Sequence, residues 1–315
     1  MYDANSKGVS YSYGILILLG LWIGGVIIGS IVSIPIWLVM TGKGMLSMGK
    51  DMLASENVNA LRVIQLVTTA IIFFLPAYFT ALILNRKPAK LLGFKTKFDA
   101  RQLVLSISII FCATFVAGAL AELNEMIPIP QKWEVSFRSL EDSYNSQVKA
   151  IAVMNNFGNY LISLFMIAIL PGIFEETFFR GGMQNLLTRS IKIPWLSILF
   201  TSIVFSLIHL SYYGFLSRVF LGIVLGLIYH YSRSLWLSIA AHCFNNGFAI
   251  TYMYVLMQKG KTVEEAMDDK MPLWGGLIGT AILFVLFVVF KKISDQVLKE
   301  STPVEDKALE EKWIA

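Results

Sequence analysis

Two adjacent carboxylates and an arginine interrupt a long apolar run of this sequence. Glu175, Glu176 and Arg180 lie in the stretch LPGIFEETFFR, downstream of a run rich in Leu, Ile, Phe and Met. An ionised side chain at bilayer depth costs about 2.5–3.5 kcal/mol on insertion scales, so it usually faces the protein interior and has a role. A carboxylate in such a place can act as a general base toward water. The stretch is therefore the first candidate for a reactive site.

Three histidines occur in the chain, and two of them, His209 and His242, could join this site. Glu175 lies about 15 residues before a short turn and His209 about 15 residues after it, so a helical hairpin with a rise of 1.5 Å per residue brings both to a similar height. Asn246 follows His242 by four residues, which places the two on one helix face.

The two adjacent glutamates are expected to point in different directions from their helix. Glu176 and Arg180 are four residues apart with the acid first, a spacing that suits an ion pair along one face. Glu175 lies about 100° round the helix from Glu176 and is free to point elsewhere. The chain thus offers a lone carboxylate, two imidazoles and a carboxamide on three apolar helices.

Two chemistries fit these groups. In the first, Glu175 is the general base on a water that His209 helps to hold, and His242 and Asn246 donate hydrogen bonds to the oxyanion of a tetrahedral intermediate. In the second, His209, His242 and Glu175 bind Zn²⁺, which activates the water. The sequence lacks the H-E-x-x-H motif typical of zinc proteases. We therefore favour a site without a cofactor and keep zinc as the alternative.

Composition indicates a protein of the membrane. The 315 residues are 56% hydrophobic and only 15% charged, with a mean hydropathy of +0.65. In soluble domains about a quarter of all residues are charged. The net charge of +5 is modest, and the basic residues lie mainly between apolar stretches, which predicts no nucleic-acid partner. Both cysteines, Cys112 and Cys243, fall within apolar stretches, and we expect no disulfide.

The apolar stretches predict an all-α polytopic transmembrane bundle of about eight spans, since a helix needs about 20 apolar residues to cross a bilayer. The expected spans are residues 13–40, 61–84, 102–123, 151–187, 194–210, 215–231, 235–257 and 273–290. Pro171 and Gly172 are expected to kink or interrupt the fourth. We expect one transmembrane domain, 1–290, with its catalytic core at 151–257, and a cytoplasmic tail, 291–315.

Charge also predicts the orientation in the membrane. An even number of spans places both termini on one side, and the basic loop 85–101 together with Lys291 and Lys292 favours the cytoplasm, in the cytoplasmic membrane if the protein is bacterial. The polar stretch 124–150 is then an exterior loop. His209 falls late in an outward-going span, and the side to which the site opens is left undecided.

Three motifs occur in order on successive predicted helices: Glu175-Glu176-x-x-x-Arg180, Phe205-x-x-x-His209 and His242-x-x-x-Asn246. This pattern, within about 155–256, resembles the CAAX protease and bacteriocin-processing family (CPBP, also called Abi), which includes the type II CAAX prenyl endopeptidases. The resemblance implies an intramembrane endopeptidase with an eight-span helical core. It also implies that Glu175 and His209 activate water while His242 and Asn246 bind the oxyanion, with either a metal-dependent or a glutamate mechanism.

The remaining motif residues are expected to support the site. Glu176 and Arg180 are interpreted as an ion pair that ties their helix to its neighbours, and Phe205 as a packing residue that shapes the pocket. Asn245 is an alternative to Asn246 as the active carboxamide.

The predicted partners are a membrane-associated peptide or protein substrate and the lipid bilayer. The resemblance implies processing of prenylated proteins, although no feature of this chain shows a lipidated substrate. The alternative is a non-catalytic membrane scaffold or bacteriocin-immunity-type protein that retains the protease fold. A transporter with an intramembrane proton relay is a third possibility, but it would more often show inverted repeats, and we find none in the sequence.

Overall fold

The computed structural model describes residues 5–94, 99–263, 265 and 273–301. These residues form helices joined by short connections, without a strand among them, and an isolated bridge pairs Ser6 with Asn85. The predicted all-α fold is confirmed. Lys95 and Lys97 of the predicted basic loop, most of 264–272 between the last two predicted spans, and 302–315 of the predicted tail lie outside the described residues.

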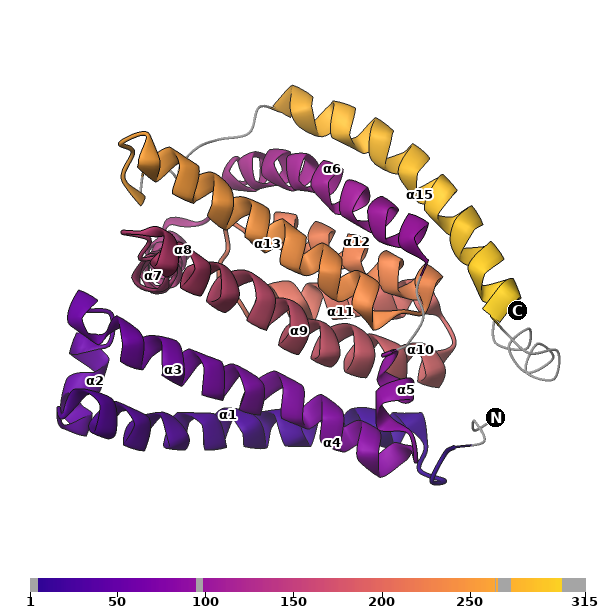
Figure 1. Ribbon diagram of the computed structural model, residues 1–315, viewed down its shortest axis with the longest axis horizontal. Coiled ribbons are helices and arrows are strands. Elements are labelled where there is room, and N and C mark those ends of the chain that lie inside the picture. The colour runs from indigo at the N-terminus through magenta and orange to yellow at the C-terminus, as the bar shows by residue number, and fades with distance from the viewer. Residues whose placement is uncertain (1–4, 95–98, 264, 266–272, 302–315) are drawn as a thin grey trace.

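The N-terminal part is a helical hairpin (Figure 1). Its elements are α1 (Tyr11–Thr41), α2 (Met45–Asp51), a 3₁₀ turn (Ser55–Asn57), α3 (Val58–Thr69), a π-helical turn (Ala70–Phe74), α4 (Leu75–Leu84) and α5 (Pro88–Leu92). Helix α1 packs along α3 and α4. This hairpin covers one side of the helices that carry the candidate residues.

The rest of the chain forms the other layers of the bundle. First come α6 (Ala100–Glu125), α7 (Gln131–Ile151), α8 (Phe157–Leu164), a π turn (Phe165–Ile169), α9 (Leu170–Glu176), a second π segment (Thr177–Gln184) and α10 (Asn185–Ile191). They are followed by α11 (Pro194–Leu207), α12 (Phe215–Ser232), α13 (Leu235–Gln258) and α15 (Leu273–Ser301). Helix α13 packs against α9 on one side and α6 on the other, so the candidate residues lie in the middle of the bundle.

Within the described residues, six helices, not eight, are long and apolar enough to cross a membrane. Helix α11 has only 14 residues, which is short of the bilayer thickness. Helix α13 has 24 residues, but it is not among the six because polar side chains such as His242, Asn245 and Asn246 lower its hydropathy. The fourth span runs from Phe157 to Ile191, later than the predicted 151–187.

The prediction that 124–150 is a loop is largely wrong, because most of it is the helix α7, while its exterior location stays a prediction. Pro130 precedes the first turn, and Glu134 pairs with Arg138 four residues on at 2.9 Å. In Figure 1, α7 is seen almost end-on beside α8, so it runs across the other helices at one end of the bundle. Its polar composition had suggested a loop, whereas its apolar residues recur at helical spacing.

Pro171 does not interrupt the fourth span; a π-helical turn precedes it instead. Proline lacks an N–H and its ring clashes with the carbonyl four residues earlier. Here the Leu170 N–H bonds to the Phe165 carbonyl, five residues back, which widens the helix just before the proline. Pro76 in α4 follows a π turn in the same way. The helix therefore continues through Pro171 with a local widening.

Helix α9 lies very close to α13 at Gly172. A Cβ atom at this position would collide with the sulfur of Cys243, and Cys243 is a free thiol, as is Cys112. The close approach brings the carboxylates of α9 within reach of the polar face of α13.

The described chain begins and ends at the same end of the bundle (Figure 1). Helix α1 starts there and α15 finishes there, and α15 continues to Ser301, beyond the predicted end of the apolar span at 290. Helix α7 and the turn between α11 and α12 lie at the opposite end. Which end faces the cytoplasm remains a prediction.

Candidate active site

Glu176 is the centre of a buried polar network. Its side chain has no exposed surface and accepts three hydrogen bonds, from Arg180 Nη1 at 2.6 Å, from His242 Nδ1 at 2.8 Å and from the Ser238 hydroxyl. All three partners are donors, which matches an ionised carboxylate. The network joins the fourth span to α13.

The bond to Glu176 fixes which nitrogen of His242 carries hydrogen. A carboxylate only accepts, so Nδ1–H is the donor, and a neutral His242 then presents the lone pair of Nε2. Only the imidazolium form carries a second donor at Nε2. Glu176 thus holds the His242 ring in place through Nδ1, as the carboxylate does in other carboxylate–histidine pairs.

Arg180 extends the network to two further helices. Its Nη2 atom donates to the Gly222 carbonyl of α12 at 3.1 Å, and its guanidinium lies 4.9 Å from the centroid of the Phe205 ring in α11. The side chain is completely buried. A buried charge of this kind requires its carboxylate partner, so the pair with Glu176 contributes to how three helices pack.

His209 lies just beyond the end of α11, in the turn that leads to α12. Its Nδ1 donates to the Phe205 carbonyl at 2.7 Å, because a carbonyl oxygen only accepts. Neutral His209 thus also presents the lone pair of Nε2. The Phe205 ring contacts both imidazoles, with centroids 5.0 Å from His209 and 6.1 Å from His242.

Glu175 differs from its neighbour Glu176. It is half-buried, and within the described part of the chain its carboxylate has no hydrogen-bond partner. It interacts electrostatically with His242, Arg180 and Arg218. Glu175 is thus a carboxylate that lies beside the network but forms none of its hydrogen bonds.

Asn246 is half-buried on the polar face of α13. Its Nδ2 atom donates to the Ile167 carbonyl at 3.0 Å, and its Oδ1 accepts from Asn245 Nδ2 at 3.1 Å. Asn245 is held in turn by the Thr114 hydroxyl through its own Oδ1 at 3.2 Å. One N–H of Asn246 therefore remains for a further acceptor.

Sequence reasoning missed three residues around this site. Ser238 precedes His242 by four residues, and this spacing could have indicated a shared face. Arg218 is an arginine in the first turn of an apolar helix, which is itself an unusual placement. Tyr144 of α7, whose ring centroid lies 6.4 Å from that of His209, carried no signal because its segment was taken for a loop.

The three predicted zinc ligands, Glu175, His209 and His242, are not gathered as a metal-binding cluster in the described part of the chain. Among the described residues, no group of three or more His, Cys, Asp or Glu side chains is placed to hold a metal ion. His242 already directs Nδ1 to Glu176, and the Nε2 atoms of both histidines would be the available ligands. A site made of Glu175, His209 and His242 would require these side chains to rearrange.

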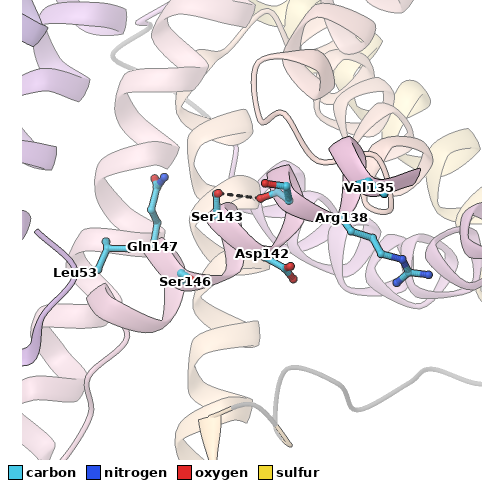
Figure 2. Close-up of a pocket in the computed structure, with 8 residues that line it drawn as sticks. Leu53, Val135, Arg138, Asp142, Ser143, Ser146 and Gln147 are labelled. Carbon is cyan, nitrogen blue, oxygen red and sulfur yellow. Dashed lines mark hydrogen bonds between the residues drawn. The ribbon is translucent and has the colours of Figure 1, made fainter. Parts of the chain in front are cut away.

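A hollow of about 700 Å³ opens elsewhere on the protein. It lies between Leu53 and the outer face of α7, where Arg138, Asp142 and Gln147 line it (Figure 2). No candidate catalytic residue reaches it. The hollow is therefore separate from the polar network.

The fold and this network define an integral membrane protein with a polar site between its helices. Residues 157–248 match the family model of the type II CAAX prenyl endopeptidases, described as Rce1-like. The segment contains Glu175, His209, His242 and Asn246 and lies within the predicted 155–256. The match covers under a third of the chain, and over this segment it supports the resemblance to the CPBP family of CAAX proteases that the motifs predict. No curated protein and no solved structure matches the chain.

Proposed function

We propose that this protein is an intramembrane endopeptidase that hydrolyses a peptide bond of a membrane-associated peptide or protein. The family match supports a protease. The observation that carries the proposal is the bond from His242 to Glu176, which holds one imidazole in a defined orientation beside the unbonded Glu175. A purely structural network would not need a second, unpaired carboxylate at the same place.

In the proposed reaction, Glu175 removes a proton from a water molecule, and His209 holds that water through Nε2. The resulting hydroxide attacks the carbonyl carbon of the scissile peptide bond. Glu175 then returns the proton to the leaving nitrogen as the carbon–nitrogen bond breaks, so that one water is consumed for each bond cleaved. Proton transfer by a positioned carboxylate contributes typically 10²–10⁴-fold to the rate.

His242 and Asn246 are proposed to stabilise the oxyanion of the tetrahedral intermediate. Asn246 has one free N–H for this purpose, and His242, held through Nδ1 by Glu176, would donate through Nε2 when both of its ring nitrogens carry hydrogen. Loss of one oxyanion donor typically lowers kcat by about 10²–10³-fold.

The substrate class is proposed from the family. Its description names CAAX prenyl endopeptidases, so prenylated peptides are the first substrates to test beside unmodified membrane-anchored peptides. A substrate that partitions into the bilayer reaches a site between transmembrane helices without crossing water.

The test is cleavage of a membrane-anchored peptide library by the purified full-length protein, read by mass spectrometry. We expect Glu175→Gln to abolish cleavage and to keep the thermal stability of the wild type. Glu134→Gln, which removes an exposed carboxylate from a surface ion pair, is the matched control and should retain cleavage. Cleavage retained by Glu175→Gln would remove this residue from the mechanism. Absence of cleavage by the wild type on all substrates would favour the scaffold alternative.

We further propose that water activation requires no metal. The hypothesis predicts that chelators leave cleavage unchanged and that the purified protein contains no stoichiometric zinc. One tightly bound zinc per chain, lost together with activity, would replace this scheme by the metal-dependent one.

A further inference from the structure

Arg218 occupies an unfavourable position at the start of α12. It lies in the first turn of this apolar helix, where its backbone N–H bonds to the Gly214 carbonyl at 3.1 Å. The N-terminus of a helix carries partial positive charge, so acidic residues are favoured there and a cation is not. An arginine at this place needs a reason other than helix stability.

The surroundings of Arg218 are shaped to hold its guanidinium. The group lies 4.8 Å from the centroid of the Tyr144 ring of α7, a distance typical of cation–π contacts. A Cβ atom at Gly214 would collide with the guanidinium. Since Gly214 has an ordinary φ of −92°, the glycine serves to leave space and not to allow a left-handed backbone.

Despite this fit, the side chain of Arg218 has no hydrogen-bond or ion-pair partner within the described residues. Its Nη1 atom is buried and unsatisfied, although its side chain as a whole is only half-buried. Other buried or half-buried arginines have acceptors: Arg62 bonds to the Ile151 carbonyl, Arg180 to Glu176 and Arg189 to Asn185. A buried donor without a partner is unfavourable, and an acceptor from outside the chain would satisfy it.

Arg218 borders the proposed reaction centre. The Tyr144 ring is a neighbour of both side chains, with its centroid 4.8 Å from the Arg218 guanidinium and 6.4 Å from the centroid of His209. Arg218 also interacts electrostatically with Glu175 and with His209. An acceptor bound to its guanidinium would thus lie next to the groups that act on the scissile bond.

We propose that Arg218 binds the C-terminal carboxylate of the peptide substrate and so selects bonds close to a free C-terminus. This inference rests on the proposed endopeptidase function. The C-terminal carboxylate is an anion that unmodified peptides carry in addition to any charged side chains. The planar guanidinium matches a carboxylate through two parallel hydrogen bonds.

The test uses two lipid-anchored peptides of one sequence, ending in a carboxylate or in a carboxamide. We expect the wild type to cleave the acid with a KM at least about tenfold lower than that of the amide, as one charge-assisted contact supplies. Arg218→Gln should raise KM for the acid to that of the amide, so that the ratio of the two KM values falls to about one. Arg218→Lys keeps the charge but not the two parallel N–H donors, so its KM for the acid should lie between those of the wild type and Arg218→Gln.

Arg189→Gln is the matched control. Arg189 also lies over a tyrosine, Tyr11, at 5.3 Å, but it belongs to α10, near the other end of α11. The Arg189→Gln protein should therefore retain the preference for the acid peptide. An equal loss on both peptides would instead show a structural or transition-state role and overturn the proposal. So would the absence of any preference in the wild type.

A binding measurement separates this inference from the proposed activity. Glu175→Gln protein should bind the acid peptide more tightly than the amide, and Glu175→Gln/Arg218→Gln protein should bind both equally. If the wild type cleaves neither peptide but the binding preference holds and depends on Arg218, the activity is wrong and the carboxylate site stands. Equal binding of both peptides by Glu175→Gln protein would reject the carboxylate site.

Discussion

The Nδ2 atom of Asn246 donates a hydrogen bond to the main-chain carbonyl of Ile167 at 3.0 Å. Ile167 lies four residues before Pro171, and its carbonyl is the one that a proline at this position deprives of a helical donor. In an apolar helix such a carbonyl must find another partner. The side chain of Asn246, which is proposed to bind the oxyanion, therefore also satisfies a backbone carbonyl of the helix that carries Glu175.

This relationship predicts coupling between the two positions. Asn246→Ala should destabilise the protein by about 1–3 kcal/mol, because it leaves the Ile167 carbonyl unsatisfied. In a Pro171→Ala background the restored N–H can reach that carbonyl, so the same substitution should cost less. A double-mutant cycle on denaturant-induced unfolding measures the difference. Strictly additive effects would show that the amide and the proline act independently.

The two adjacent glutamates should behave in opposite ways. Glu176→Gln removes the charge that balances the fully buried Arg180 and should destabilise the protein by about 3–5 kcal/mol. Glu175→Gln removes a carboxylate that has no hydrogen-bond partner among the described residues and should change stability by less than about 1 kcal/mol. Thermal unfolding of both variants in one detergent decides this. A large loss of stability for Glu175→Gln would show that it is a structural residue.

Phe205 should be required for the arrangement of both imidazoles. Its ring contacts Arg180, His209 and His242, and it is 5% exposed. Phe205→Ala should lower the free energy of unfolding by about 3–5 kcal/mol, while Phe205→Leu, which keeps more side-chain volume, should lower it by less. Circular dichroism followed through thermal unfolding gives both values. Cleavage that survives in Phe205→Ala at the wild-type rate would argue against any positioning role of the ring.

The sequence carried enough information for the helical membrane fold and for the family resemblance of 157–248, because hydropathy and residue spacing are local properties. It also predicted the pairing of Glu176 with Arg180, since both lie on one face of one helix. The orientation of His242 by Glu176 was not predicted, because it depends on how closely α9 approaches α13 at Gly172. The role of each candidate catalytic residue remains a prediction, since packing alone does not reveal a reaction.

Helix α7 was missed because its polar residues outnumber the apolar ones, and its partners lie far along the chain. One of its faces packs on the turn after α11. Phe137 stacks on Tyr212 with centroids 4.8 Å apart, and Glu141 accepts a hydrogen bond from the Ser211 hydroxyl at 2.6 Å. Such distant contacts cannot be read from local spacing.

These contacts predict that α7 holds the turn that carries His209. Glu141→Gln weakens the charge-assisted bond to Ser211, and Phe137→Ala removes the stacked ring, so the double variant should loosen the turn. We expect amide hydrogen exchange in residues 208–214 to become at least about tenfold faster, which corresponds to a loss of about 1.4 kcal/mol of local stability. Exchange within α13 should stay unchanged, because α13 makes its main contacts with α6, α9 and α12. Unchanged exchange in the turn would mean that Asn124 of α6, which donates to the Tyr212 carbonyl at 3.0 Å, holds it without help from α7.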